Sequence, residues 1–267
     1  FKFSYAKYTI PISFIKYVIQ SFYICFKYDV DIIHCRSYLP NLIGIILKIY
    51  MRKFLIFDMR GLWPEEIALG LKNGKKSLIY LILILLEKAN INFSDSIVSL
   101  TNAAKLFLEK KYKINKNKIC VIPTCVDTKK FEVLSLPRKK VKTFSSIGTI
   151  LSDWFLLDWL KRFIICVNEI DPSAKFEIIT RDNKDLINSK LNFNKNLAKK
   201  LTIKSANPDD IPLLIKNHSA SAFFFKKGLS KLGSSPTRFG EILAVGRPII
   251  CNSGVGDLDN LIIKNNV

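Results

Sequence analysis

The apolar positions of the chain follow two alternating patterns. Short continuous apolar runs are typical of strands buried on both faces, and between them apolar residues recur every three or four positions, as in amphipathic helices. In the first half this predicts strands at 30–34, 54–58, 96–100 and 119–122 and helices at 39–50, 75–91 and 102–111. In the second half it predicts strands at 143–147, 175–180, 201–204, 220–225 and 248–251 and helices at 155–170, 184–191, 209–216 and 236–244. This order indicates the α/β class, with parallel sheets covered by helices on both faces.

A polar, basic segment at residues 132–142, which contains Pro137, interrupts the alternation and is typical of an interdomain linker. With 267 residues the chain is long enough for two domains. We therefore expect two doubly wound domains that face a cleft, at residues 1–134 and 135–267. The chain begins with Phe1 and ends at Val267 soon after a predicted strand, so we expect both domains to be cut from a longer protein.

The chain carries a strong positive charge. It has 42 Lys and Arg against 22 Asp and Glu, a net charge of +20, which favours an anionic partner. Few aromatic residues lie within the basic runs and no RNA-recognition, helix-turn-helix or zinc-finger pattern is present, so a membrane surface is favoured over nucleic acid. We found no secretion signal and expect a cytoplasmic protein, peripheral at the inner face of the cell membrane.

Two apolar stretches are candidates for membrane spans, since the mean hydropathy of +0.17 is high for a soluble protein. The stretch 8–26 is interrupted by Pro11, Lys16 and Gln20, and the stretch 78–86 is about half as long as a bilayer requires. Both are interpreted as buried or interfacial helices.

Cysteine and histidine usage argues against disulfide and metal chemistry. The six cysteines form no Cys-x-x-Cys pair and mostly lie in apolar strand-like runs, so we expect reduced thiols in the core. His34 and His218 are the two histidines, and no His, Glu and Asp cluster has metal-ligand spacing, which favours a metal-independent protein without a cofactor. The Gly254 to Asp257 segment lacks the third glycine of a dinucleotide fingerprint and is interpreted as a tight turn.

The strongest chemical signal is a helix start in the second half. Ser235 is placed to cap a helix that Pro236 opens, with Thr237 in its first turn, and Gly246 is placed to end it. A helix N-terminus suits the diphosphate of a nucleotide. The Glu241 carboxylate, further along the helix, has two oxygens that can accept hydrogen bonds from a ribose diol. The alternative is an ordinary surface helix with a solvated glutamate.

In parallel α/β sheets, ligands bind beyond the carboxyl ends of the strands, which selects further residues in the first half. Arg60 and Gly61 follow a predicted strand; the guanidinium offers a forked donor and the glycine allows a close backbone approach. His34 ends another strand and either lines the acceptor side or is a core histidine. Residues 63–66 are interpreted as a shaped loop, and its two glutamates as acid/base candidates or as solvated residues at a helix start.

Several segments together resemble family 4 glycosyltransferases, which are retaining GT-B enzymes that build cell-surface polysaccharides. The segments occur in the family's order and span nearly the whole chain: 31–36, 57–66, 99–101, 121–127 and 241–250. The resemblance implies two Rossmann-like domains of the GT-B fold, with the first domain incomplete. It also implies that the second domain holds a nucleoside-diphosphate sugar and the first holds the acceptor.

The resemblance also assigns residues, with two departures. Glu241 matches the second glutamate of the family's Glu, seven residues, Glu pattern and is the implied ribose ligand. The first glutamate falls on Gly233, and the Arg and Lys pair expected after Gly148 is absent. Gly148 itself is kept as a donor-binding residue. Substitutes for the missing basic pair are sought among three residues: Arg181, Lys226 and Lys231.

These observations predict an enzyme that transfers a sugar from a nucleotide sugar to a saccharide or lipid-linked acceptor, with no nucleic acid partner. Three alternatives remain open. They are a nucleotide-sugar epimerase of the same fold, a non-catalytic basic module that binds membrane or nucleic acid, and a truncated, inactive fragment.

Overall fold

The computed structural model describes residues 11–132 and 141–265, and they form two compact units. Within these residues the first unit comprises 11–123, 228–235 and 256–265, and the second comprises 124–132, 141–227 and 236–255. Both units hold a parallel sheet and helices, so the predicted α/β class is confirmed. The sequence predicts a single boundary after residue 134, whereas in the structure the later segments 228–235 and 256–265 group with the first unit. That boundary and the predicted cleft stay predictions, and residues 133–140 of the predicted linker lie outside the described residues.

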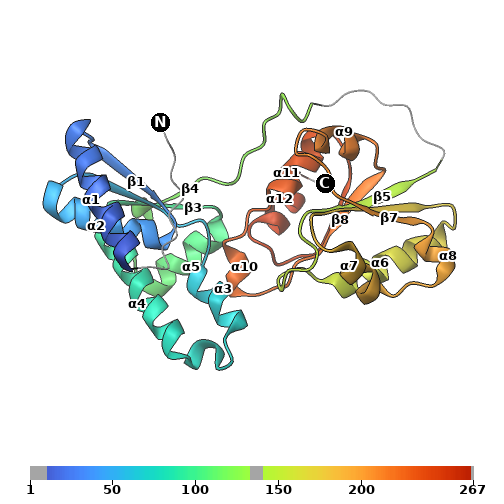
Figure 1. Cartoon of the computed structure of the whole chain (residues 1–267), viewed down its shortest axis with the longest axis horizontal. Helices are drawn as coiled ribbons and strands as arrows, with labels where there is room; N and C mark the ends of the chain where they lie inside the picture. Colours follow the sequence, from blue (N-terminus) through green and yellow to red (C-terminus); the bar gives the residue numbers. More distant parts are fainter. Residues whose placement is uncertain (1–10, 133–140, 266–267) are drawn as a thin grey trace. The chain divides into compact units, whose positions relative to one another are not determined.

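The first unit is built on a four-stranded parallel sheet in the order β1-β2-β3-β4. Its strands are β1 (Ile32–Arg36), β2 (Phe54–Asp58), β3 (Ser96–Ser99) and β4 (Ile119–Val121). Its helices are α1 (Pro11–Lys27), α2 (Tyr38–Met51), α3 (Trp63–Gly70), α4 (Leu78–Phe93), α5 (Asn102–Tyr112), α10 (Leu229–Leu232) and α12 (Leu258–Asn265). Figure 1 shows α1, α2, α4 and α5 gathered around this sheet. Two 3₁₀ turns, Gly74–Lys76 and Lys116–Lys118, complete the unit.

The core of the first unit follows from the apolar central strands. Leu55 and Phe57 of β2 and Ile97 of β3 are fully buried, and Phe57 is paired in register with Ile97. The Tyr38 ring, at the start of α2, meets the Phe57 ring edge to face at a centroid distance of 5.1 Å. This packing fixes the carboxyl ends of β1 and β2, where the first-half candidate residues lie.

The second unit contains a five-stranded parallel sheet in the order β7-β6-β5-β8-β9. Its strands are β5 (Thr143–Ile147), β6 (Lys175–Ile179), β7 (Leu201–Lys204), β8 (Ala220–Phe223) and β9 (Ile249–Cys251). Its helices are α6 (Leu157–Ile170), α7 (Lys184–Leu191), α8 (Lys195–Ala198), α9 (Ile211–Lys216) and α11 (Thr237–Ala244). Helices α6, α7 and α8 lie on one side of the sheet, and α9 and α11 on the other (Figure 1). This is a doubly wound order, in which ligands bind at the carboxyl edge of the strands.

The predicted strands and long helices are present within a few residues of their predicted bounds. The interpretation of residues 63–66 as a loop is wrong, because they begin α3. Pro64 lies in the first turn of that helix, and Glu65 and Glu66 favour its N-terminal end. The helices α8, α10 and α12 were not predicted; α8 and α10 have four residues each, and segments this short carry little periodicity.

The expectation that all cysteines lie in the core is also wrong. Cys25 and Cys35 are buried, but Cys120, Cys125 and Cys166 are exposed. Cys120 faces outward because it alternates with the buried Ile119 in β4, which is an edge strand. All six cysteines are free thiols, as predicted.

Candidate functional site

A pocket of about 450 Å³ lies at the carboxyl edge of the second sheet. The residues that follow β5 and β6 form part of its wall, and α11 contributes Arg238 and Glu241. Three predicted donor-binding residues, Gly148, Arg181 and Glu241, therefore line one pocket. The rest of its wall comes from three further segments: residues 125–127, residues 130–131 and residues from 206 to 211.

The loop after β5 exposes main chain to this pocket. Gly148 has a φ of +124°, a conformation that favours glycine, and a Cβ added there would meet no atom within 4 Å. Its N–H donates to the Ile179 carbonyl oxygen at 3.0 Å. The Asp182 carboxylate accepts from the N–H groups of Ile150 and Leu151 at 2.6 and 2.9 Å. The loop is thus held in place while its glycine leaves room for a ligand.

The helix that carries Glu241 starts differently from the prediction. Helix α11 begins at Thr237 with Pro236 in the N-cap position, and no side chain caps it. The prediction that Ser235 caps this helix is therefore wrong, since Pro236 occupies the position that an N-cap side chain would need. Thr237 is exposed at the helix start, and neither Pro236 nor Thr237 lines the pocket. Gly246, with a φ of +72°, follows the last turn as predicted.

The pocket holds both signs of charge. Arg238 forms an ion pair with Glu241 one helical turn away. Lys130 and Arg181 also line the pocket, and Lys130 Nζ lies 2.5 Å from the Asp209 carboxylate. A guanidinium beside a carboxylate is suited to a ligand that has both an anionic group and a diol.

Two residues of this pocket, Arg238 and Lys130, were not predicted from the sequence. The three-residue spacing of Arg238 and Glu241 on a predicted helix was a usable signal for Arg238. Lys130 had no such signal, because its segment precedes the predicted domain boundary. In the structure the segment packs in the second unit, where Val126 lies against Gly240 of α11.

Two predicted donor-binding residues, Lys231 and Ser235, lie in the first unit instead. Lys231 is buried; burial lowers the pKa of its ammonium group, and the negative charge of Glu66 opposes that shift. Ser235 lines a second pocket of about 360 Å³, which also includes Asp257. Neither residue lines the pocket of the second unit, so the structure does not bring them together with Gly148, Arg181 and Glu241. Lys226, the third basic substitute, is exposed in the second unit and is not among the pocket residues either.

The Gly254 to Asp257 segment forms the predicted tight turn. Gly254 and Gly256 have φ values of +84° and +51°. The Asp257 carboxylate then accepts hydrogen bonds from the N–H groups of Asn102 and Ala103 at 2.7 and 2.9 Å. It therefore occupies the N-terminal end of α5 and links the last described segment to the first sheet.

The first-half candidates meet at the ends of β1 and β2. His34 Nε2 lies 3.7 Å from Asp58 Oδ2, and Arg60 Nη1 lies 4.0 Å from the same oxygen. The His34 side chain is 59% exposed, so the alternative of a core histidine is wrong. Arg60 has a φ of +61°, which is unusual for a residue with a side chain. Asp58 ends the predicted strand two residues before Arg60, and the structure places its carboxylate near both basic side chains.

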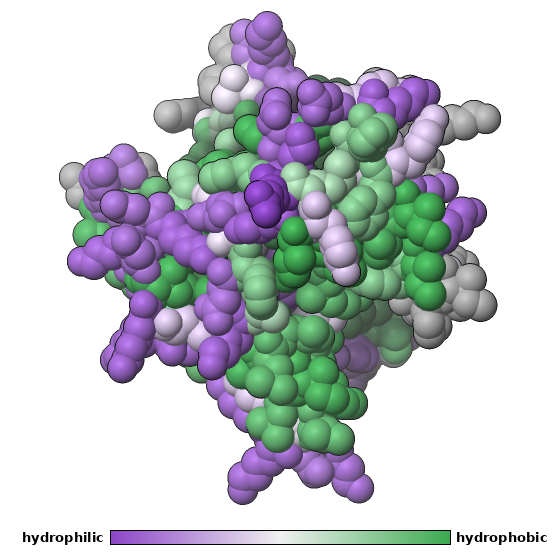
Figure 2. Space-filling model, turned by 90° about the vertical axis from the view of Figure 1, so that its left-hand side faces the viewer, coloured by the Kyte–Doolittle hydropathy of each residue, from purple (hydrophilic) through white to green (hydrophobic). Residues whose placement is uncertain are grey.

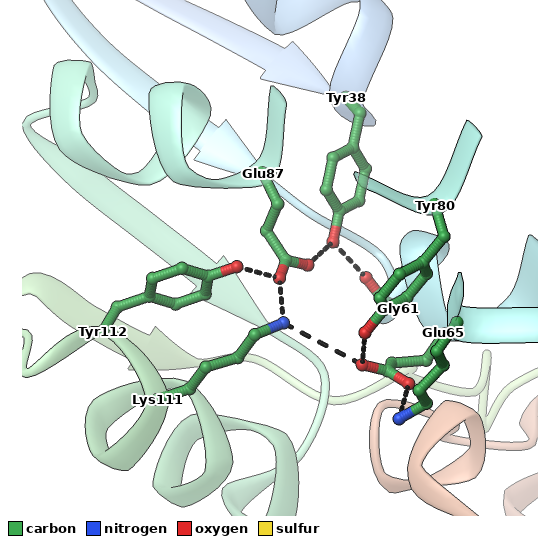
Figure 3. A network of polar contacts seen from close by, with 8 residues as sticks. Tyr38, Gly61, Glu65, Tyr80, Glu87, Lys111 and Tyr112 are labelled. Carbon is green, nitrogen blue, oxygen red and sulfur yellow. Dashed lines mark hydrogen bonds and ion pairs between the residues drawn. The ribbon is translucent and has the colours of Figure 1, made fainter. Parts of the chain in front are cut away.

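A buried carboxylate, Glu87, lies at the centre of a polar network that reaches Gly61 through Tyr38 (Figure 3). Glu87 Oε2 accepts from the Tyr38 hydroxyl at 2.9 Å, and Oε1 accepts from Tyr112 at 2.5 Å and Lys111 at 2.8 Å. The Tyr38 hydroxyl also lies 3.0 Å from the Gly61 carbonyl oxygen. Burial and the charge of Glu87 raise the pKa of both tyrosines, so both hydroxyls remain protonated, and Tyr38 connects the network to the Gly61 turn.

Glu65 joins the same network from α3. Its carboxylate accepts from the Tyr80 hydroxyl at 2.9 Å and pairs with Lys75 at 2.6 Å. Burial and the hydrogen bond to Glu65 raise the pKa of Tyr80 to about 12. The alternative of a solvated residue is therefore wrong for Glu65, which is buried, whereas Glu66 is exposed. Both Glu65 oxygens are in contact with neighbouring side chains, so its contacts indicate a structural role in holding α3.

The position of the missing first glutamate is tightly packed. A Cβ added at Gly233 would lie 3.0 Å from Gly61 Cα and 3.2 Å from the Leu62 nitrogen. Both contacts are to main chain, which cannot rotate away as a side chain can. In this arrangement of the first unit, a glycine is the residue that fits at position 233.

Among the residues that the structure describes, no group of three or more His, Cys, Asp or Glu side chains is placed to hold a metal ion. In the same residues, no helix combines the length and the apolar character that crossing a membrane requires.

Residues 3–130 match the model of Glycosyltransferase Family 4, so the resemblance drawn from the sequence motifs is confirmed. No curated protein matches the chain. Three solved structures are similar to this chain. A sucrose-phosphate synthase of Thermosynechococcus elongatus has a TM-score of 0.69 and 13% identity and covers 97% of this chain. A glycosyltransferase of Rickettsia africae has a TM-score of 0.65, 16% identity and 97% coverage, and HepE of Anabaena with UDP and glucose has a TM-score of 0.62, 11% identity and 92% coverage. At these identities the likeness shows the fold, and the two Rossmann-like sheets are those of GT-B proteins. The chain spans 65%, 67% and 64% of those three structures.

Proposed function

We propose that this chain, whose residues 3–130 match the model of Glycosyltransferase Family 4, transfers a sugar from a nucleoside-diphosphate sugar to a saccharide or lipid-linked acceptor. One observation carries the proposal. The pocket of the second unit brings together the open main chain at Gly148, the Glu241 carboxylate and three basic side chains: Lys130, Arg181 and Arg238. A nucleotide sugar needs this combination, because it has a ribose diol and a diphosphate.

Each group of the donor has a proposed partner in the pocket. The ribose hydroxyls donate to Glu241, whose two oxygens match a diol. The diphosphate lies near Arg181 and Arg238, whose guanidinium groups can bind its oxygens in a forked manner. Negative charge that develops on the leaving diphosphate is stabilised by the same groups. HepE has been crystallised with UDP and with UDP-glucose, so UDP-glucose is the first donor to test.

The acceptor is proposed to lie at the ends of β1 and β2. His34 and Arg60 present polar groups there, and Gly61 allows a close approach to the main chain. Exclusion of water from the reacting sugar favours transfer over hydrolysis. By resemblance, the reaction retains the configuration at the anomeric carbon, needs no metal or other cofactor, and serves cell-surface polysaccharide synthesis at the cytoplasmic face of the membrane.

A product assay separates transfer from the epimerase alternative. Radiolabelled UDP-glucose is incubated with the chain, with and without an acceptor mixture of saccharides and extracted lipids. Transfer predicts UDP release and a labelled product that depend on the acceptor and are lost in the Glu241→Ala variant. A labelled epimer formed from the donor alone would instead identify an epimerase. Donor binding with neither product would contradict the proposed reaction.

A further inference from the structure

Helix α4 has two polar residues on its buried side, beside Leu83 and Ile91, and a set of aliphatic residues on its exposed side. Its buried positions include two polar residues, Glu87 and Asn90. Its exposed positions include five large aliphatic residues that are 48–71% exposed: Leu78, Ile79, Leu81, Ile82 and Leu85. A helix of a globular protein normally shows the opposite distribution. The network of Figure 3 fixes this orientation, because Glu87 is held from three sides by Tyr38, Lys111 and Tyr112.

The exposed aliphatic residues form one continuous face. At 3.6 residues per turn, Leu78, Ile82 and Leu85 fall in one row, with Leu81 on one side and Ile79 on the other. In Figure 2, hydrophobic side chains gather over the part of the first unit where α4 lies. Single exposed leucines are common on protein surfaces, whereas a continuous apolar face marks an interaction site. We call these five residues the α4 face.

The surroundings of the α4 face are basic. Lys72, Lys75 and Lys76 lie directly before the helix, and Lys88 follows the exposed row. From residue 67 to residue 86 the sequence contains no Asp or Glu. All three lysines are exposed, and Lys75 also pairs with Glu65 at 2.6 Å. The aliphatic face is therefore bordered by positive charge.

We propose that the α4 face binds an anionic lipid membrane, with the helix lying in the plane of the interface. The aliphatic side chains then enter the boundary between headgroups and acyl chains, about 5–10 Å deep, and the lysines contact anionic headgroups. The helix has 16 residues, which is too short to span a bilayer. A second copy of the chain is a poorer occupant, because a two-fold contact through this face would bring like-charged lysines together. The inference rests on the membrane location named in the proposed function and assigns the surface that makes the contact, and its test does not depend on donor binding.

Vesicle flotation tests the proposal directly. The full chain is mixed, without nucleotide, with vesicles of phosphatidylcholine plus phosphatidylglycerol or of phosphatidylcholine alone. We expect the chain to float with the anionic vesicles and much less with the neutral ones. The Leu81→Ser/Leu85→Ser variant should bind at least about tenfold more weakly, because each leucine loses its transfer into an apolar phase. The Lys72→Gln/Lys76→Gln variant should lose roughly fivefold per lysine.

A matched control substitutes an exposed aliphatic residue elsewhere. Ile170, at the exposed end of α6 in the second unit, is replaced by serine, and we expect unchanged vesicle binding. All substituted residues are exposed, so circular dichroism should show that every variant is folded. The proposal is overturned if the wild-type chain does not bind anionic vesicles or if the leucine variant binds as the wild type does. Self-association that the leucine variant abolishes, with vesicle binding unchanged, would assign the α4 face to a second copy.

Discussion

Replacing Glu87 by glutamine tests whether the network in Figure 3 is held by a negative charge. Glutamine has nearly the same shape, and its amide oxygen can accept from Tyr112 and Lys111 as Oε1 does now. Its amide nitrogen can donate to the Tyr38 hydroxyl, which then donates its own hydrogen to the Gly61 carbonyl. Each group keeps a partner, so the substitution removes the charge and little else.

The expected magnitude follows from the number of charged contacts. Hydrogen bonds to charged groups contribute about 1.5–3 kcal/mol and neutral ones about 0.5–1.5 kcal/mol. Two donors meet Glu87 Oε1, so Glu87→Gln should lower the free energy of unfolding of the first unit by about 2 kcal/mol. Glu87→Leu leaves the Tyr112 and Lys111 donors without this acceptor and should cost more, about 3–5 kcal/mol.

Urea unfolding followed by tryptophan fluorescence measures these differences. Trp63 reports on the network because its ring centroid lies 5.4 Å from that of Tyr38. Glu169→Gln, at an exposed position of α6, serves as the control and should change the free energy of unfolding by no more than about 0.5 kcal/mol. A Glu87→Gln variant as stable as the wild type would show that the negative charge does not stabilise the network and would refute this reasoning.

Two further stability predictions follow from the packing and the charges. Gly233→Ala places a Cβ 3.0 Å from main chain and should lower the free energy of unfolding in urea by about 1–3 kcal/mol. Gly70→Ala is the control, because its Cβ would meet no atom within 4 Å, and it should be neutral or slightly stabilising. Equal effects of the two substitutions would contradict the packing argument. Burial raises the pKa of Glu177, but hydrogen bonds from basic neighbours, including His218 at 3.0 Å, lower it below the ordinary 4.5. The stabilisation that Glu177 provides is therefore present at neutral pH and lost as the pH falls through this lowered pKa, so the gap in unfolding free energy between wild type and Glu177→Gln should shrink below about pH 4.5, and a gap independent of pH would argue against the pairing.

The rule that ligands bind beyond the carboxyl ends of parallel strands predicted several residues of the second-unit pocket from the sequence. Gly148 and Arg181 follow β5 and β6, and Glu241 lies on a helix bounded by recognisable start and stop residues. Strand positions are visible in a sequence because buried parallel strands are continuous apolar runs. In a parallel sheet the carboxyl ends of neighbouring strands lie at one edge, so order along the chain predicts proximity there.

Residues that depend on long-range packing could not be predicted in the same way. Lys130 and Val126 precede the predicted boundary but pack in the second unit, and Lys231 and Ser235 follow it but pack in the first. No local pattern reports such exchanges between units, because they arise from contacts far apart in the sequence. Ser235 was assigned to the diphosphate site as the predicted cap of the Glu241 helix, and Lys231 as a basic substitute for the missing Arg and Lys pair.

The orientation of α4 illustrates a second limit. Its apolar run predicted either a buried or an interfacial helix, and periodicity cannot separate the two when most positions are apolar. The choice depends on Glu87 and Asn90, which are buried because side chains from α2 and α5 provide their hydrogen-bond partners. A sequence does not show that two polar residues will be satisfied inside a fold.

The claim that the pocket of the second unit binds a nucleotide sugar is tested most directly by calorimetric titration of UDP, ADP and GDP sugars in metal-free buffer. The wild-type chain should bind one nucleotide class selectively, and Glu241→Ala should bind it at least about tenfold more weakly, because two hydrogen bonds to a charged group are lost. Glu169→Ala should bind as the wild type does. Binding that is unchanged in Glu241→Ala, or no binding of any nucleotide sugar to the wild-type chain, would contradict the assignment of this pocket.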